Sequence, residues 1–227
     1  DSYFELHIEQ GPLMEDKETS VGVVTGGYAS HALTIVFHGE CAHTATTEMK
    51  KRRNAMIGAS YFLAAVNDIG WEYEPIGRTS ATRMVIWPNK FGILPEYTEV
   101  TVDMRHPERK ITNEMVAKTR AALTEAAEKA NVDYEITAEW TFGDEVFDPD
   151  CAQLVRDAAI SRGISQMDMT SIAGHDAYFI SRIAPTALVF SPCIDGITHN
   201  EAEDVKRKPT IEAVNVFFDA VVARADR

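Results

Sequence analysis

The order of hydrophobic periodicities in the middle of the chain constrains the fold more than any other sequence feature. Apolar residues alternate with polar ones where strands are expected and recur every three or four residues where helices are expected. These segments are 33–37 (strand), 56–66 (helix), 84–86 and 100–104 (strands), 116–130 (helix) and 134–140 (strand). From about Ser30 to Trp140 the order is βαββαβ, which predicts a ferredoxin-like domain. In its last strand the alternation places Tyr134, Ile136, Ala138 and Trp140 on one face.

The flanking segments predict a different kind of domain. Thr186 to Phe190 is a continuous apolar run, which is typical of a strand buried on both faces of a parallel sheet. One helix is expected after Asp148, with Asp148 as N-cap and Pro149 at the first helical position. A second is expected after Pro209, and its apolar stripe is predicted to be Ile211, Val214, Phe218 and Val221.

With an opening strand from Tyr3 to Ile8, these pieces predict an α/β domain that the ferredoxin-like domain interrupts. The expected division is 1–25 and 144–227 for the α/β domain, and 26–143 for the insert. Glycines at 26–27 and 143 mark the expected crossings between them.

Composition excludes several classes of protein. The 227 residues contain 22 Lys+Arg and 35 Asp+Glu, a formal charge of −13, which argues against a nucleic-acid partner. No apolar run approaches the roughly 20 residues that span a bilayer, so no membrane partner is expected. Three widely spaced cysteines favour a reducing, cytoplasmic setting. The start at Asp1, without Met, suggests a piece of a longer polypeptide.

Two histidines at predicted strand ends are candidate metal ligands. His7 closes the first strand, with Gln10 following it, and His199 lies in the loop after the buried apolar run. Ligands of open α/β sheets bind at the carboxyl ends of strands, and imidazole is a common ligand for zinc-like metals. Taken singly, His7 is more typical of a hydrogen-bonded core histidine, and His199 is equally consistent with a loop histidine exposed to water.

A third histidine lies in Ala173-Gly174-His175-Asp176. Gly174 before a helix start can present backbone N–H groups to an anion or an oxyanion. The plainer interpretation is that His175 and Asp176 begin that helix.

His43 and Arg105 are the candidates within the insert. His43 lies in a polar loop before a helix whose first turn is expected to hold Lys50, Lys51, Arg52 and Arg53. Cations there oppose the helix dipole, which indicates paired carboxylates, an anionic ligand or simply a solvated surface. Arg105 points away from the face of Val102 and Met104 and can bind a carboxylate in a bidentate manner. A salt bridge to Asp103 or Glu108 is the plainer alternative.

Five segments in a fixed order resemble the M20-type metallohydrolases, in the branch with allantoate amidohydrolase, N-carbamoyl-L-amino acid hydrolase and β-ureidopropionase. The matching segments are 5–12, 43–53, 103–107, 173–177 and 196–201. The signatures GxGxxG, GxxxxGK[ST], GxSxG and HExxH are absent. The resemblance covers nearly the whole chain.

The resemblance implies an α/β catalytic domain interrupted by a ferredoxin-like lid that also forms a homodimer. It further implies that two divalent metals (Zn, Mn, Co or Ni) are bound per subunit and that His7 and His199 are among their ligands. Gln10, Gly174 and His175 would contact the substrate. From the lid, His43 would stabilise the oxyanion and Arg105 would hold a substrate carboxylate.

The chain departs from the family pattern in two respects. The H-x-D motif, the bridging Asp and the Glu-Glu pair, which in the family precede the segment that starts here, are absent from the 227 residues. This chain alone is therefore not expected to complete a two-metal site. Gly92 replaces a usual Asn, and Ala45 and Ile172 replace usual glycines, so the substrate is left open.

The leading hypothesis is a metal-dependent amidohydrolase that cleaves a C–N bond in a small ureido, N-carbamoyl or amide compound bearing a carboxylate. An M20 aminoacylase or dipeptidase acting on N-acyl or peptide amides is the competing enzyme hypothesis, favoured by Gly92. A non-catalytic dimerisation or small-acid binding module is the third hypothesis, favoured by the incomplete ligand set.

Overall fold

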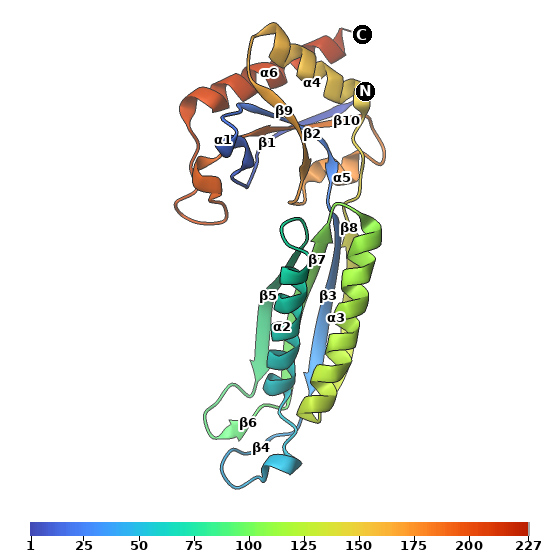
Figure 1. The fold of residues 1–227 in the computed structure, drawn as a ribbon, viewed down its shortest axis with the longest axis vertical. Helices are drawn as coiled ribbons and strands as arrows, with labels where there is room; N and C mark the ends of the chain where they lie inside the picture. Colours follow the sequence, from blue (N-terminus) through green and yellow to red (C-terminus); the bar gives the residue numbers. More distant parts are fainter. Residues whose placement is uncertain (227) are drawn as a thin grey trace. The chain divides into compact units, whose positions relative to one another are not determined.

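The computed structural model describes residues 1–226 and divides the chain into two compact units (Figure 1). One unit, the α/β unit, consists of Asp1–Tyr28 and the chain from Gly143 onward. The other, the inserted unit, consists of Ala29–Phe142. The expected crossing at 25/26 falls inside a strand, because Gly26 and Gly27 continue a ladder with the strand that ends at Ser171.

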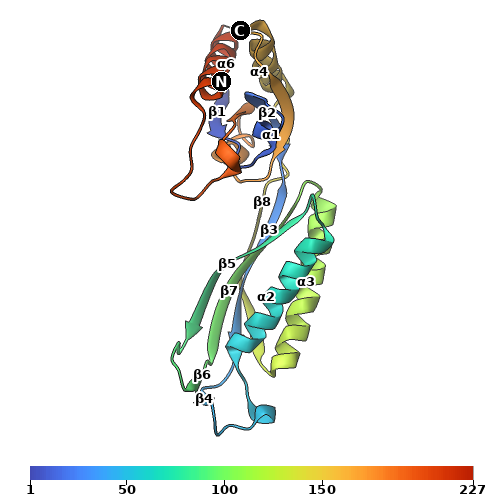
Figure 2. The same cartoon turned by 60° about the vertical axis from the view of Figure 1, so that its left-hand side comes forward.

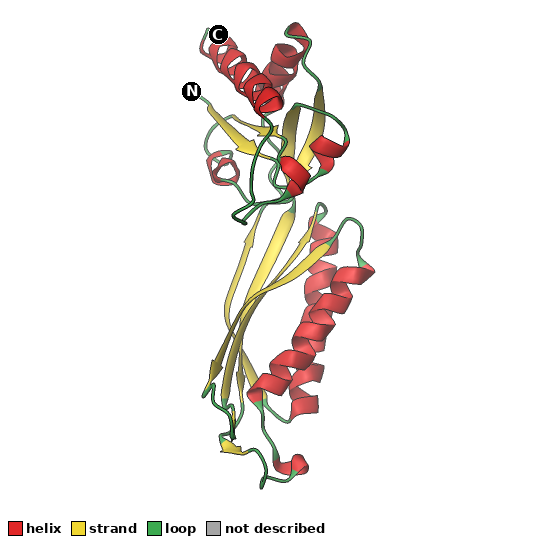
Figure 3. Ribbon diagram, turned by 90° about the vertical axis from the view of Figure 1, so that its left-hand side faces the viewer, coloured by secondary structure: helices red, strands yellow, loops and turns green. Residues whose placement is uncertain are grey.

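The inserted unit has the predicted βαββαβ order. Its elements are β3 (Ala29–His38), β4 (Ala42–His43), the 3-10 turn Met49–Lys51, α2 (Ala55–Glu72), β5 (Arg78–Trp87), β6 (Ile93–Leu94), β7 (Tyr97–His106), α3 (Arg109–Ala130) and β8 (Asp133–Phe142). The main sheet has the order β5-β7-β3-β8 with antiparallel neighbours. Both long helices cover one face of this sheet (Figures 2 and 3). This is the ferredoxin-like arrangement.

The alternation in β7 produces the core of the inserted unit. Val100, Val102 and Met104 are fully buried and form one cluster with Phe37 of β3 and Phe62 of α2. Their neighbours along the strand, including Asp103 and Arg105, are only partly buried and point to the sheet face without helices.

A bulge overturns the predicted single face of β8. Ile136 lies opposite the core residue Ile35, whereas Ala138 lies opposite Thr34, so the register shifts between them. Ala138 and Trp140 therefore lie on the face opposite to Tyr134 and Ile136, because one extra residue reverses the direction of every side chain beyond it.

The four cations at 50–53 do not form the first turn of a helix, contrary to the prediction. Helix α2 begins at Ala55, and the Asn54 side chain caps it by accepting from the backbone N–H groups of Met56 and Ile57. Lys50 and Lys51 lie in the separate 3-10 turn, so the expected conflict with the dipole of the helix does not arise.

The α/β unit has a four-stranded mixed sheet. Its elements are β1 (Tyr3–Ile8), α1 (Leu13–Asp16), β2 (Val21–Gly27), α4 (Pro149–Ser161), β9 (Gln166–Ser171), α5 (Asp176–Ile180), β10 (Thr186–Ser191), the 3-10 turn Ile194–Gly196 and α6 (Arg207–Ala225). The strand order is β1-β10-β2-β9, with β1 parallel to β10, β10 antiparallel to β2, and β2 parallel to β9. Helix α4 starts as predicted, with the Asp148 carboxylate accepting from the Cys151 amide at 2.8 Å. Helices α4 and α6 pack against one face of the sheet.

The predicted inward stripe of the last helix is wrong. Small residues of α6 face the core, namely Ala213, Val216 and Ala220, all fully buried. Ile211, Val214 and Phe218 are 48%, 45% and 63% exposed. The prediction placed the larger apolar side chains in the core. Small side chains such as alanine face the sheet instead, because they allow the helix to pack closely against it. None of the helices in residues 1–226 is both long enough and apolar enough to span a membrane.

Two phenylalanines of the inserted unit provide a matched test of this core. Phe62 is fully buried on α2, whereas Phe91 is fully exposed in the turn before β6. We expect Phe62→Ala to lower the free energy of unfolding by about 3–5 kcal/mol, since it removes buried surface and leaves a cavity. Phe91→Ala should change it by less than about 0.5 kcal/mol. Urea unfolding measures both, and equal losses would contradict the described packing.

Candidate active site

The parallel pairing of β1 with β10 brings two predicted metal ligands to one edge of the sheet. His7 lies opposite Phe190 and Ile8 opposite Ser191, so both strands end together and the chain leaves β10 toward His199. The His7 Nδ1–H donates to the Ile8 carbonyl at 2.9 Å. This bond places the lone pair of the neutral ring on Nε2, which is the form that binds a metal.

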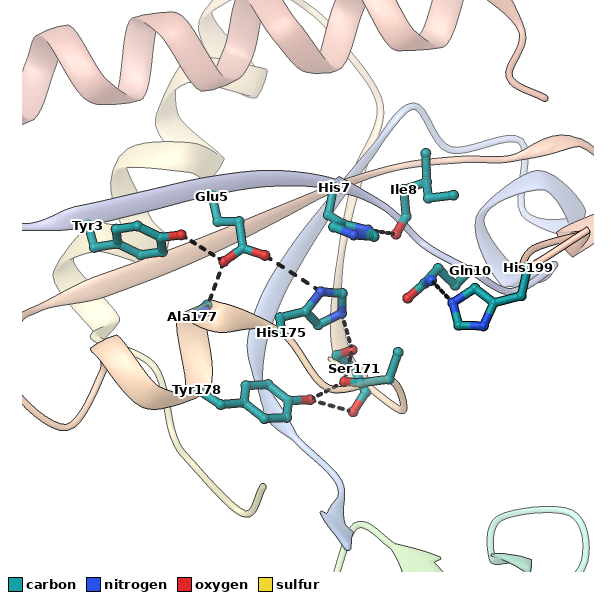
Figure 4. Close-up of polar contacts among 11 residues, drawn as sticks. Tyr3, Glu5, His7, Ile8, Gln10, Ser171, His175, Ala177, Tyr178 and His199 are labelled. Carbon is teal, nitrogen blue, oxygen red and sulfur yellow. Dashed lines mark hydrogen bonds and ion pairs between the residues drawn. The ribbon is translucent and has the colours of Figure 1, made fainter. Parts of the chain in front are cut away.

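Gln10 and His199 are in contact across this edge (Figure 4). The Gln10 amide Nε2 donates to Thr198 Oγ1 at 3.2 Å and lies 3.4 Å from His199 Nε2. Both Gln10 (φ 60°) and His199 (φ 52°) have left-handed backbones, which side-chain-bearing residues adopt at a cost. A left-handed backbone at both positions indicates that the surrounding contacts hold them in place.

Glu203 is one of those contacts. Its Oε2 accepts from the Thr198 hydroxyl at 2.8 Å and from the His199 amide at 3.0 Å. These two hydrogen bonds lower the pKa of the Glu203 carboxyl from its usual value, and the bond from Thr198 makes the larger contribution. The carboxylate thereby fixes the turn that presents His199.

Close packing holds the same loop against the end of β1. A Cβ on Gly196 (φ 65°) would lie 2.7 Å from the Pro12 nitrogen, so only glycine fits there. The Cys193 thiol lies 3.6 Å from the Gly11 carbonyl oxygen, and Glu9 accepts from the Leu13 and Met14 amides at 3.0 and 2.8 Å. The segments carrying Gln10 and His199 are thus fastened to each other.

His175 is buried directly beside His7. The two rings meet edge to face with centroids 4.6 Å apart. His175 Nε2 lies 3.0 Å from Ser171 Oγ, and Nδ1 lies 3.6 Å from Glu5 Oε1. Burial, with a smaller contribution from His7, lowers the pKa of His175 to about 4, so the ring is neutral near pH 7.

The segment around Gly174 is held by protein groups. His175 occupies the N-cap position of α5, in line with the plainer expectation, but its side chain makes no capping bond. The Ala177 amide donates to Glu5 Oε2 at 2.8 Å, and the Tyr178 hydroxyl donates to the carbonyls of Ser171 and Ala173. Both His175 ring nitrogens face protein atoms, and the substrate-binding role of Gly174 and His175 stays a prediction.

The donor chemistry at the β1–β10 edge suits a divalent metal, but the donor set is small. His7 and His199 supply imidazole nitrogens, the usual ligands of zinc-like ions. Within residues 1–226, no group of three or more His, Cys, Asp or Glu side chains is arranged to hold a metal ion. His7 and His199 are therefore suited to be two ligands of a metal, and their role as metal ligands stays a prediction.

Arg105 is fixed on the open face of the inserted sheet. Its Nε and Nη2 donate to Asp103 Oδ2 at 2.9 and 2.6 Å, and its guanidinium lies 5.3 Å from the centroid of the Phe142 ring. Ser80 Oγ donates to the other Asp103 oxygen at 2.8 Å. The salt bridge expected as the plainer alternative is present, and it orients a guanidinium suited to carboxylates.

His43 has a defined tautomer. It is exposed on β4, and its Nδ1 accepts from the backbone amides of Ala45 (3.1 Å) and Thr46 (3.3 Å). The proton of the neutral ring therefore lies on Nε2, which can donate a hydrogen bond outward. Arg52 stiffens the loop by donating to the carbonyls of Thr44 and Thr47.

Arg105 and His43 lie toward opposite ends of the inserted sheet. Arg105 pairs with Ser30 at the start of β3, whereas His43 follows the end of β3 at His38. Eight residues of strand separate Ser30 from His38, about 27 Å at the usual rise. One small molecule does not reach both residues of the same chain.

Sequence reasoning missed Glu5, Ser171 and Glu203. Glu5 shares the face of His7 two residues away, and Glu203 follows His199 by four, so spacing offered a weak signal for both. Ser171 contacts His175 because β9 ends at Ser171 and a short turn leads from it to the start of α5.

Comparison with known proteins decides the family. The profile described as peptidase family M20/M25/M40 matches residues 1–223. The chain belongs to this family. An N-carbamoyl-L-amino-acid amidohydrolase of Rhizobium meliloti is 36% identical over 225 residues, which are 99% of this chain and 54% of that protein. An allantoate amidohydrolase of Bacillus subtilis is 27% identical over 206 residues, 89% of this chain and 49% of that protein.

Solved M20 relatives agree with the fold. The crystal structure of a hydantoinase/carbamoylase family amidase from Burkholderia vietnamiensis superimposes with a TM-score of 0.93 at 38% identity, over 99% of this chain and 54% of that one. The predicted mixed α/β class is confirmed. The chain spans about half the length of the curated relatives it matches.

Tyr178 provides a test of the segment next to His7. Tyr178→Phe removes the hydroxyl that donates to both carbonyls, while the Tyr28 amide and the Ser171 hydroxyl still donate to them. We therefore expect a loss of about 0.5–1.5 kcal/mol in the free energy of unfolding, the net value of a typical hydrogen bond. Tyr61→Phe, on a half-exposed ring of α2, serves as the control and should change it by less than about 0.5 kcal/mol. Urea titrations of both variants measure the difference, and a Tyr178→Phe protein as stable as the control would show that the hydroxyl does not hold this segment.

Proposed function

We propose that the complete protein is a metal-dependent amidohydrolase that cleaves a C–N bond in a small ureido, N-carbamoyl or amide compound bearing a carboxylate. The observation that carries the proposal is that His7 lies at the end of β1 beside β10, and that Gln10, three residues further on, is in contact with His199. Membership of the M20 family and relatives named N-carbamoyl-L-amino-acid and allantoate amidohydrolases support this chemistry.

His7 and His199 would hold part of a site for two divalent metals, with Zn, Mn, Co and Ni all suited to nitrogen and carboxylate ligands. Such ions, when bound, polarise a carbonyl and lower the pKa of a bound water. The residues of this chain have separate tasks. The His7–Ile8 bond keeps the lone pair of His7 on Nε2, and Glu203 and Gln10 fix the orientation of His199.

Two residues of the inserted unit would act on the substrate. Arg105 would bind its carboxylate, because Asp103 and Phe142 already hold the guanidinium in one orientation. His43 would donate its Nε2–H to the carbonyl oxygen as negative charge develops there, since its Nδ1 is occupied by two amides. Gln10, Gly174 and His175 would complete the substrate contacts from the α/β unit.

The separation of Arg105 from His43 supports a homodimer. A small substrate held by Arg105 of one chain lies too far from the His43 of that chain, so a second copy must supply His43. Exposed Phe91 and Met49 in the loops next to His43 agree with a contact there.

Substrate assays separate the proposal from its alternatives. N-carbamoyl amino acids and allantoate should be hydrolysed by the complete protein in the presence of Mn²⁺ or Zn²⁺, and N-acetyl amino acids and dipeptides much more slowly. The reverse preference would favour an aminoacylase or dipeptidase, for which the Gly92 substitution argues. Carboxylate binding without hydrolysis of any of these would favour the binding module.

Arg105→Ala tests carboxylate recognition. We expect a loss of about 2–5 kcal/mol in apparent binding, seen as a higher KM, because a charge-assisted contact disappears. Arg83→Ala, which removes another arginine from the open face of the same sheet, is the control and should leave KM near its normal value. An unchanged KM in Arg105→Ala would remove Arg105 from the site.

His43→Ala tests both the oxyanion role and the dimer. It should lower kcat by about 10²–10³ while His38→Ala, a nearby exposed histidine, does not. The His43→Ala and Arg105→Ala proteins are then mixed, allowed to exchange subunits and assayed at a substrate concentration far below the raised KM of Arg105→Ala, where each alone is nearly inactive. Activity should return to about a quarter of normal, since half of the dimers then carry one intact site of two. A mixture as inactive as its parts would show that both residues act in one chain.

A further inference from the structure

Phe91 is the most exposed large apolar side chain among residues 1–226, ahead of Val146 and Ile183. Leaving such a ring in water forgoes a favourable burial term of about 1.5–3 kcal/mol. Single apolar side chains on a surface are common in proteins. What Phe91 can do therefore depends on what lies next to it.

A tight turn presents Phe91 to solvent. The Ile93 amide donates to the Lys90 carbonyl at 3.5 Å, so Lys90 to Ile93 form a four-residue turn in which Phe91 is second. Gly92, the third residue, has φ 93°, close to the left-handed value that a type II turn requires there. A Cβ on Gly92 would meet no atom within 4 Å, so the space beside the turn is open.

The same turn is fastened to the loop that carries His43. Strands β4 and β6 lie side by side at one end of the inserted unit, with His43 opposite Ile93 (Figures 1 and 2). The Thr44 amide donates to the Gly92 carbonyl at 3.2 Å. Opposite residues of paired strands lie about 5 Å apart, and two residues of chain span at most about 7 Å. The backbones of His43 and Phe91 are thus at most about 12 Å apart, and both side chains can contact one small molecule.

The proposed reaction determines which part of the substrate comes near Phe91. In that reaction His43 donates to the carbonyl oxygen of the bond that is cleaved. In the N-carbamoyl derivative of an α-amino acid, the carbon that bears the carboxylate is two bonds from this carbonyl carbon, about 2.5 Å away. The substituent on that carbon is the amino-acid side chain, so it also lies close to His43.

We propose that Phe91 selects the substrate by packing against this substituent, and that the preferred substrates are N-carbamoyl amino acids with large apolar side chains. The inference rests on the proposed function, in which a second copy of the chain supplies His43, because Phe91 then enters the same site. The contact removes the phenyl ring and the apolar substituent from water together. Glycine derivatives have no substituent, and allantoate carries a polar second ureido group there, so neither gains from the contact.

The substrate preference of the complete protein tests this role. The measured quantity is the ratio of kcat/KM for N-carbamoyl-L-phenylalanine to kcat/KM for N-carbamoylglycine. We expect the unmodified protein to favour the phenylalanine derivative and Phe91→Ala to lower the ratio at least about tenfold, since even one methylene in an apolar pocket discriminates by about 10–200-fold. Phe91→Leu should retain part of the preference. Trp71→Ala, which removes another exposed aromatic side chain near the end of α2 remote from His43, should leave the ratio unchanged.

A Phe91 that serves only as a dimer contact gives a different result. Phe91→Ala would then lower kcat/KM equally for both substrates, or convert dimers to monomers in size-exclusion chromatography without changing the ratio. An unchanged ratio overturns the proposal. An unmodified protein that favours the glycine derivative or allantoate overturns it as well.

Isothermal titration calorimetry with the same two compounds separates this inference from the proposed function. If the complete protein binds them but hydrolyses neither, the proposed function fails. Tighter binding of the phenylalanine derivative that Phe91→Ala abolishes would still support selection by Phe91, whereas equal affinities would overturn it. Binding of neither compound overturns both.

Discussion

The parallel ladder between β1 and β10 is the interaction on which the candidate site depends. It joins the first strand of the chain to the last, and it places His7 next to the strand from which the chain runs on to His199. The ladder is secured from one side by the core under α4 and α6, where Ala187 and Val189 are buried. Without it, two histidines 192 positions apart in the sequence would not lie at one sheet edge.

Periodicity predicted most of the fold, because it reports which residues face a core. The four strands and two helices of the inserted unit follow from it. Periodicity failed to predict which face a residue occupies where a strand contains a bulge or a helix packs through small residues. One extra residue in β8 separates Ile136 from Ala138, and the small residues of α6 pack inward while Phe218 remains outside. Neither a bulge nor the close packing of a helix through alanines can be recognised from the spacing of apolar residues in the sequence.

The candidate site was predictable only in part. His7, Gln10 and His199 could be selected because they lie at or after the ends of strands expected to meet at the same edge of the sheet. Glu203 and Glu5 could not, because a carboxylate is common on any surface and its role depends on which donors the fold brings to it. Glu5 accepts from Ala177, which lies 172 residues away. Arg105 and His43 were selected from residue type and position, the resemblance supplied their expected roles, and their placement at opposite sheet ends became visible only in the structure.

The central claim is that His7 and His199 are ligands in a metal site that this chain builds only in part. The most direct test is the metal content of the complete protein, measured by elemental analysis for the unmodified form and for His7→Ala, His199→Ala and the exposed control His38→Ala. The account predicts two metals per subunit in the unmodified protein and in the control, and fewer in the other two variants. Equal metal content in all four proteins, or no metal in any of them, would contradict it.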